Sequence, residues 1–122
     1  MIRIQQVIYA VVLREHPTIV KIGRTTNWLR RRSSYDNWNF ALGDGISNLA
    51  VYCVTDEYVD LAGLESACLG AMNKPLVRGF EWFRADLDHA RKAIESILIA
   101  SQISFVEFDF NDPKVTKFKR PA

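Results

Sequence analysis

The 122-residue chain contains only two cysteines, Cys53 and Cys68. One lies in an apolar run and the other in a helical pattern, so the sequence argues against a disulfide framework and predicts two small buried thiols in a reducing compartment. The two histidines, His16 and His89, lie far apart and next to no cysteine pair. This spacing argues against a zinc site.

Long hydrophobic runs are also absent. The N-terminal stretch is apolar only from Val7 to Leu13, which is far short of the roughly 20 residues of a membrane-spanning helix, and no small-residue cleavage site of a secretory signal follows it. We therefore expect a cytoplasmic protein with no membrane partner. Without repeats or low-complexity linkers, residues 1–122 are expected to form one domain, with its core over about 6–100 and a C-terminal strand and basic tail over 104–122.

Acidic residues are missing between His16 and Tyr35, although the net charge of the chain is only +2. This segment holds five Lys or Arg residues, whereas the segment from Asp56 to Asp112 holds eleven acids against five bases. One surface should therefore be strongly positive, and an anionic partner such as nucleic acid is plausible. A run such as "LRRRSS" is equally compatible with a solvated helix face.

Residue patterns divide the chain into a few short elements. We expect strands at 5–13, 19–24, 49–55 and 104–110, a turn at 14–18, a short helix at 25–37, a loop at 40–48, a helix within 56–74, an extended segment at 75–85, and a last helix capped by Asp86. The first two strands form a hairpin. The fold class is therefore α/β (α+β), with a small sheet and helices in one domain.

Glu65 is the most unusual residue of this layout. It falls among Leu61, Leu64, Cys68 and Met72, on the stripe of the helix that should face the core. Burying an unpaired carboxylate is costly. Glu65 is therefore either protonated, paired with a cation such as Arg31 or Lys21 in a structural ion pair, or bound to a metal ion.

The hairpin should also bring Tyr9 and Lys21 together, next to the arginine-rich helix, in a position where they can face Glu65. Such a set suits phosphodiester chemistry, because Lys or Tyr can orient or deprotonate water, Arg can neutralise a phosphorane-like transition state, and a carboxylate can hold Mg²⁺. The alternative is that Tyr9 is a packing residue and Lys21 a solvent-facing one, with Gly23 a simple turn residue. Spacing alone does not decide between these.

Several ordered motifs resemble the GIY-YIG nuclease superfamily. They are "VIY" at residues 7–9, "KIG" at 21–23, "RTTNWLRR" with Arg31 eight residues after the glycine, and "LAGLESACL" with Glu65. The "EWF" segment at 81–83 is similar to the phage-associated branch that has "KIG" followed by "RT". The resemblance covers residues 6 to about 95 and implies a central, mainly antiparallel three-stranded sheet flanked by helices.

This resemblance implies a metal-dependent endonuclease that hydrolyses phosphodiester bonds, with DNA favoured over RNA and the chain acting as a monomer or homodimer in a bacterial or phage-infected cell. Tyr9 and Lys21 would position and activate water, Arg31 would contact the scissile phosphate, and Gly23 would allow close backbone approach. Glu65 would hold Mg²⁺, for which Mn²⁺ can substitute. In a site with one carboxylate, Mg²⁺ keeps several waters.

The remaining basic and aromatic residues near this site are candidate nucleic-acid ligands. They are Arg24, Trp28, Arg30, Arg32 and Tyr35. Arg30 or Arg32 replaces Arg31 as the phosphate ligand if the register shifts by one, and Trp28 either stacks on a base or packs in the core. Glu81 is either an acid that supports the catalytic residues from behind or one that lies near a helix, and a structural role is expected for Glu81, Trp82 and Phe83.

The chain departs from the family pattern in three places. "VIY" lacks the opening glycine, lysine replaces the tyrosine of the second motif, and Tyr35 stands where many members have a histidine. Two further functions therefore stand beside the nuclease: a nucleic-acid-binding module that is catalytically weak or inactive, and a protein-interaction or inhibitor domain whose basic helix docks on an acidic surface.

Overall fold

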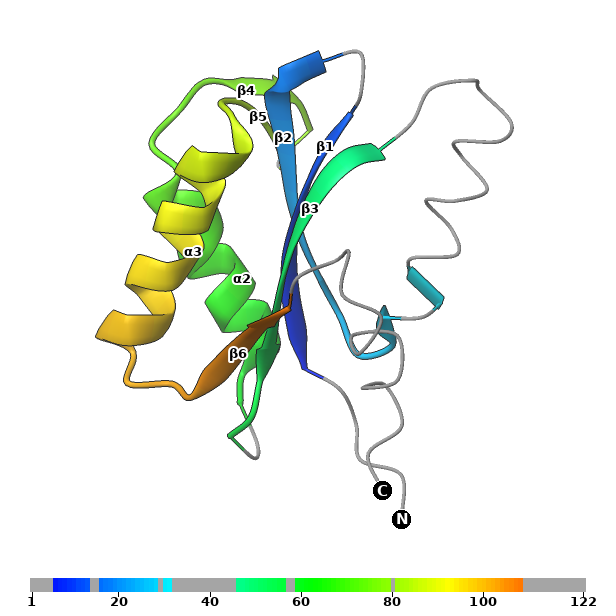
Figure 1. The fold of residues 1–122 in the computed structure, drawn as a ribbon. Helices are drawn as coiled ribbons and strands as arrows, with labels where there is room; N and C mark the ends of the chain where they lie inside the picture. The colour runs from blue at the N-terminus through cyan, green and yellow to red at the C-terminus, as the bar shows by residue number, and fades with distance from the viewer. Residues whose placement is uncertain are drawn as a thin grey trace.

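The computed structural model describes residues 6–13, 16–28, 30–31, 46–56, 59–79 and 81–108 (Figure 1). The elements are β1 Val7–Leu13, β2 His16–Thr25, β3 Ile46–Val54, α2 Leu61–Ala71, β4 Leu76–Arg78, β5 Trp82–Arg84, α3 Leu87–Ala100 and β6 Phe105–Phe108. A sheet with helices packed against it confirms the predicted α+β class.

The sheet has six strands in the order β4-β5-β2-β1-β3-β6, and each neighbouring pair is antiparallel. The predicted three-stranded sheet is its centre, β2-β1-β3. The expected strand count is too low because the segment 75–85 folds into the β4-β5 hairpin, which adds to the outer side of β2. The expected late strand is confirmed as β6, which pairs with β3.

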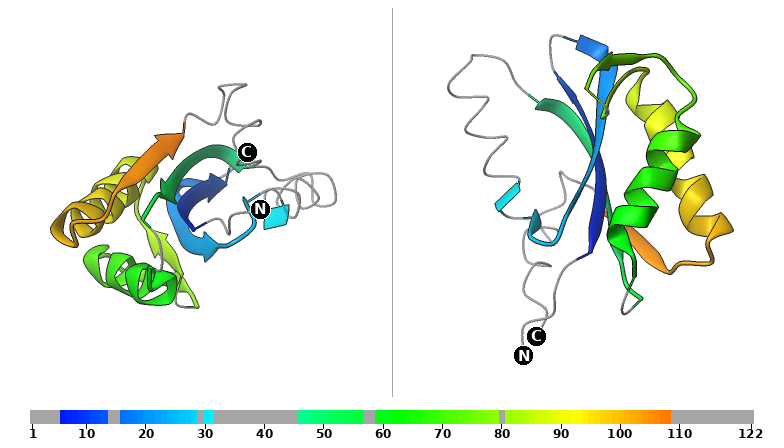
Figure 2. Two further views of the ribbon diagram at one scale, coloured as in Figure 1. Left: turned by 90° about the horizontal axis from the view of Figure 1, so that it is seen from below. Right: turned by 180° about the vertical axis from the view of Figure 1, so that it is seen from behind.

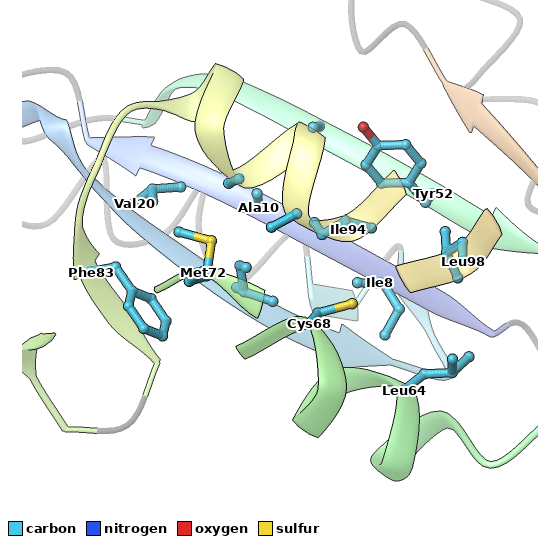
Figure 3. Close-up of a cluster of buried hydrophobic side chains, with 14 of the residues drawn as sticks. Ile8, Ala10, Val20, Tyr52, Leu64, Cys68, Met72, Phe83, Ile94 and Leu98 are labelled. Carbon is cyan, nitrogen blue, oxygen red and sulfur yellow. The ribbon is translucent and has the colours of Figure 1, made fainter. Parts of the chain in front are cut away.

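Alternation along the strands gives the sheet two apolar faces. On β1, Ile8 and Ala10 belong to the larger core, which α2 and α3 cover, and Tyr9 and Val11 belong to a smaller cluster on the other face. Figures 1 and 2 show both helices on the same side of the sheet. The larger core includes Cys68, which lies among aliphatic and aromatic side chains (Figure 3).

Aspartate side chains cap both helices, as these sequences favour. The carboxylate of Asp86 accepts a hydrogen bond from the backbone N–H of His89 at 2.8 Å, which confirms the predicted cap, and Asp60 accepts from Gly63 at 3.0 Å. Helix α2 therefore starts at Leu61, later than the start of the predicted range. The predicted turn 14–18 is too long, because β2 begins at His16.

Cys53 and Cys68 are both free and buried, which confirms the expectation of two small buried thiols. Burial and the nearby charge of Glu65 raise the pKa of the Cys68 thiol to about 12, from an ordinary value of 9.0. Burial also raises the pKa of Cys53. None of the described helices is long and apolar enough to cross a membrane.

These buried thiols predict a loss of stability at alkaline pH. An unfolded chain releases the Cys68 proton near pH 9, whereas the folded chain keeps it until about pH 12, so the free energy of unfolding is unaffected below pH 9 and falls between these values. Urea denaturation at pH 7, 9 and 10 measures this decline. Cys68→Ala should cost about 1 kcal/mol at pH 7 and show a shallower decline; an equal decline in both proteins would contradict this assignment.

Candidate active site

Tyr9, Gly23 and Lys21 share the face of the sheet opposite the helices. Tyr9 is the direct cross-strand partner of Gly23, and Lys21 is the partner of Val11. Lys21 is therefore a diagonal neighbour of Tyr9, at a Cβ separation of roughly 7–8 Å. The hairpin brings these two residues together, as the sequence predicts.

The Tyr9 ring lies directly against the backbone of Gly23. A Cβ atom added to Gly23 would overlap the Oη and Cζ atoms of Tyr9. On the same face, the Trp28 ring is tilted 49° to the Tyr9 ring, with the centroids 5.4 Å apart. Gly23 is thus required by the approach of Tyr9, and the side chain of Tyr9 is only 1% exposed.

The chain after β2 turns into a helical segment at Trp28, Arg30 and Arg31. The hydroxyl of Thr25 accepts a hydrogen bond from the N–H of Asn27 at 3.0 Å, and the Asn27 side chain accepts from the N–H of Arg30 at 3.2 Å. This local capping is what Thr and Asn favour before a helix. It presents Arg30 and Arg31 as exposed residues directly after the strand.

Trp28 belongs to the core. Its side chain is 5% exposed and clusters with Tyr9, Val11 and Leu49, among others. Of the two alternatives for this residue, the structure shows the packing one. A ring this buried has little face left for a nucleobase, so the candidate role in base stacking is not supported.

Lys21 lies between an acid and an aromatic ring. Its Nζ atom is 3.4 Å from an Oε atom of Glu81 and 5.9 Å from the ring centroid of Trp82. Trp82 is the cross-strand partner of Lys21, and the backbone carbonyl of Glu81 accepts a hydrogen bond from the N–H of Ile22 at 3.1 Å. The β4-β5 hairpin therefore places both neighbours of the Lys21 ammonium group.

Glu65 lies on the other face of the sheet, where α2 covers β2, so the expectation that it faces Tyr9 and Lys21 is wrong. Its carboxylate is 3.5 Å from the Nε atom of Arg24, and the two side chains are 18% and 46% exposed. Arg24 is two residues after the buried Ile22 on β2, so both side chains lie on this face. Glu65 is thus partly buried and paired with a cation. Its partner is Arg24, which the sequence suggested only as a phosphate guide.

The two faces meet at the outer edge of β2. The ladder between β2 and β5 covers Ile19 to Lys21, so in the described part of the chain the strand from Gly23 to Thr25 forms this edge without β5. Lys21 approaches the edge from one face, and Arg24 with Glu65 from the other. We call Lys21, Gly23, Arg24 and Glu65 the β2 edge site.

A metal ion at this site would have few protein ligands. Among the residues that the structure describes, no three His, Cys, Asp or Glu side chains form a metal-binding cluster. Glu65 alone fits a hydrated Mg²⁺, which often takes one or two carboxylates and completes its shell with water and phosphate oxygens. Arg24 competes for the same carboxylate, but its half-exposed side chain can move away to a phosphate.

Arg32 and Tyr35, two of the predicted nucleic-acid ligands, lie outside the described residues, as does the basic tail after residue 108. The sequence did not identify the pairing of Glu81 with Lys21. One feature of the sequence pointed to this pairing. The segment "PLV" at 75–77 is followed by "EWF" at 81–83, and two such short stretches are compatible with a hairpin beside β2.

A second polar group lies between β3, α3 and β6. Buried Tyr52 donates a hydrogen bond from its hydroxyl to Glu95 at 2.7 Å, and Arg91 pairs with Glu107 at 2.5 Å. Burial first, and then the hydrogen bond to Glu95, raise the pKa of Tyr52 well above its ordinary range. This group ties α3 to the edge strand β6 and does not touch the β2 edge site.

Comparisons of the chain with protein-family models, with curated proteins and with solved structures find no match. The case for a function therefore depends on the residues and the geometry described above.

Replacing Gly23 tests whether the Tyr9 contact is essential. In Gly23→Ala, the new methyl group must displace the Tyr9 ring, so the free energy of unfolding should fall by about 1–3 kcal/mol. Gly70→Ala is the matched control, because Gly70 lies in α2 with open space around it; that change should add about 0.5–1 kcal/mol. Urea denaturation measures both, and a Gly23→Ala protein as stable as wild type would refute the contact.

Proposed function

We propose that this protein is a metal-dependent endonuclease that hydrolyses phosphodiester bonds of nucleic acid, DNA in preference to RNA, by a GIY-YIG-type mechanism. The observation that supports it is the β2 edge site. There, Glu65, whose partly buried carboxylate would hold a metal ion, and its partner Arg24 lie on one face of β2, while Lys21 and Tyr9 lie on the other face, next to the stretch of edge that no described strand pairs with.

The cations suit a phosphodiester backbone. Lys21 and Arg24 come from β2, and Arg30 and Arg31 follow directly after it, with no acid in this stretch of sequence. Such a row attracts and orients polyanions, and cations in a partly buried site stabilise charge that develops on a phosphoryl group. In the proposal, Arg31 contacts the scissile phosphate and Arg24 the neighbouring backbone.

The proposal gives Glu65 the metal-binding role and Lys21 and Tyr9 the positioning of water. A bound Mg²⁺ would supply Lewis-acid stabilisation of the departing 3′ oxygen. Arg24 pairs with the carboxylate and holds it in place before substrate arrives, and its half-exposed side chain is able to turn toward a phosphate. Tyr9 packs against Gly23 of the neighbouring strand, with its hydroxyl close to the Gly23 backbone.

A nucleic-acid-binding module is the second candidate function, and one observation favours it. Tyr9 is 1% exposed, so its ring serves packing at least as directly as chemistry. Cations along the edge of a strand are sufficient for binding that weakens with salt. The binding module and the nuclease differ in one respect: whether Glu65 and a divalent ion are required for turnover.

Glu65→Gln separates these two functions. Because the pair with Arg24 is partly exposed and worth about 0–1 kcal/mol, the variant should fold and still bind labelled DNA. It should cut labelled single-stranded, duplex or branched DNA at least about 100-fold more slowly than wild type in Mg²⁺ or Mn²⁺. EDTA should stop cutting by wild type.

Asp88→Asn is the matched control for this experiment. Asp88 is an exposed acid on α3, paired with Lys92 at 3.1 Å, and it lies near Thr18 at the start of β2, roughly 20 Å along the strand from Arg24. This variant should cut like wild type. Salt-sensitive binding by wild type without cutting of any DNA or RNA substrate would contradict the nuclease and favour the binding module.

A further inference from the structure

We propose that Glu81 is a positioning residue, which holds the ammonium group of Lys21 in place, and that Lys21 acts as a charged donor to the phosphate and not as the base. This inference rests on the proposed nuclease function. It assigns a role at the site to an acid that the sequence suggested was structural.

Two side chains of the β4-β5 hairpin contact the Lys21 ammonium group, and a backbone hydrogen bond holds the hairpin beside it. The Glu81 carboxylate lies 3.4 Å from Nζ, the Trp82 ring centroid lies 5.9 Å from Nζ, and the hydrogen bond from Ile22 to the Glu81 carbonyl anchors the hairpin at this point. The Lys21 side chain is only 14% exposed, whereas that of Glu81 is 45% exposed. The amine is thus the more buried partner of this pair.

Fixing a lysine in the free protein is useful for a catalytic site. A free lysine side chain samples many rotamers, and ordering it on each encounter with substrate opposes binding and chemistry. Contacts that order it beforehand remove this entropic cost from the reaction step. Glu81 provides such a contact without being a ligand of the phosphate itself, because like charges repel.

The same contacts identify the form in which Lys21 works. A carboxylate and the face of an indole ring both interact favourably with a cation. An amine held between them has N–H donors and positive charge to offer to a phosphate oxygen. A general base would have to be neutral. The geometry therefore suits charge stabilisation, and the activation of water falls to another group.

The test compares Glu81→Gln and Glu81→Asp with wild type in steady-state cleavage of the DNA that wild type cuts. Glu81→Gln should lower kcat by roughly 10- to 100-fold while KM stays the same or falls, and Glu81→Asp should recover part of the loss. An acid that is merely near the substrate would behave in the opposite way, because removing its negative charge would tighten binding and leave kcat unchanged.

Lys21 variants test its proposed chemical role. Lys21→Arg keeps the charge and should retain measurable cutting, whereas Lys21→Met should not. A second readout needs no cleavage: the reactivity of the Lys21 amine toward an acylating reagent, measured by mass spectrometry, should rise in Glu81→Gln. Thermal melting followed by circular dichroism checks that each variant is folded. If Glu81→Gln does not fold, Glu81→Asp is used for the same measurements.

The outcomes distinguish this inference from the function on which it rests. Glu81→Gln with wild-type kcat and wild-type Lys21 reactivity would overturn the positioning role while the nuclease stands. Loss of all cutting in Lys21→Arg would overturn the charged-donor role. Wild type that cuts no substrate would overturn the nuclease and, with it, both roles.

Discussion

The register between β1 and β2 is the constraint on which the site depends. With Tyr9 opposite Gly23, strand alternation sends Lys21 to one face of the sheet and Arg24 to the other. A slip of one residue would exchange these faces and would place a side chain where the Tyr9 ring now lies. Any Cβ at position 23 would overlap Tyr9. The glycine therefore fixes the register, and with it the packing of the smaller core and the faces on which the cations lie.

Each of the two ion pairs at the β2 edge combines one mostly buried side chain with one exposed side chain. Lys21 is mostly covered and its partner Glu81 is open to solvent, whereas Glu65 is mostly covered and its partner Arg24 is open. In each pair the less exposed member is the one that the proposed chemistry requires, and its partner keeps it ordered. Short strands achieve this placement, because β5 begins at Trp82, directly after Glu81, and among the described strands none pairs with the outer edge of β2 beyond this point.

Local patterns in the sequence were sufficient to predict much of this fold. The hairpin, the stripe of α2 and the Asp86 cap each depend on residues close in the chain, and the hairpin alone brings Tyr9 and Lys21 to one face. Partners from distant segments were harder to predict. Glu81 pairs with Lys21 only because β4 and β5 form a hairpin that adds to β2, and a segment of three-residue strands carries little periodic signal. The choice of Arg24 as the partner of Glu65 depends on how α2 lies over β2, which no local pattern encodes.

The central claim is that a divalent ion and nucleic acid meet at the β2 edge site. Paramagnetic broadening by Mn²⁺ tests it directly, in a two-dimensional amide NMR spectrum recorded with a bound oligonucleotide. Substoichiometric Mn²⁺ should broaden the amide signals of Glu65, Arg24 and Gly23 and leave that of His16, roughly 26 Å along β2 from Arg24, much sharper. This broadening should be lost in Glu65→Gln. Broadening centred on another part of the chain, or none at all, would contradict it.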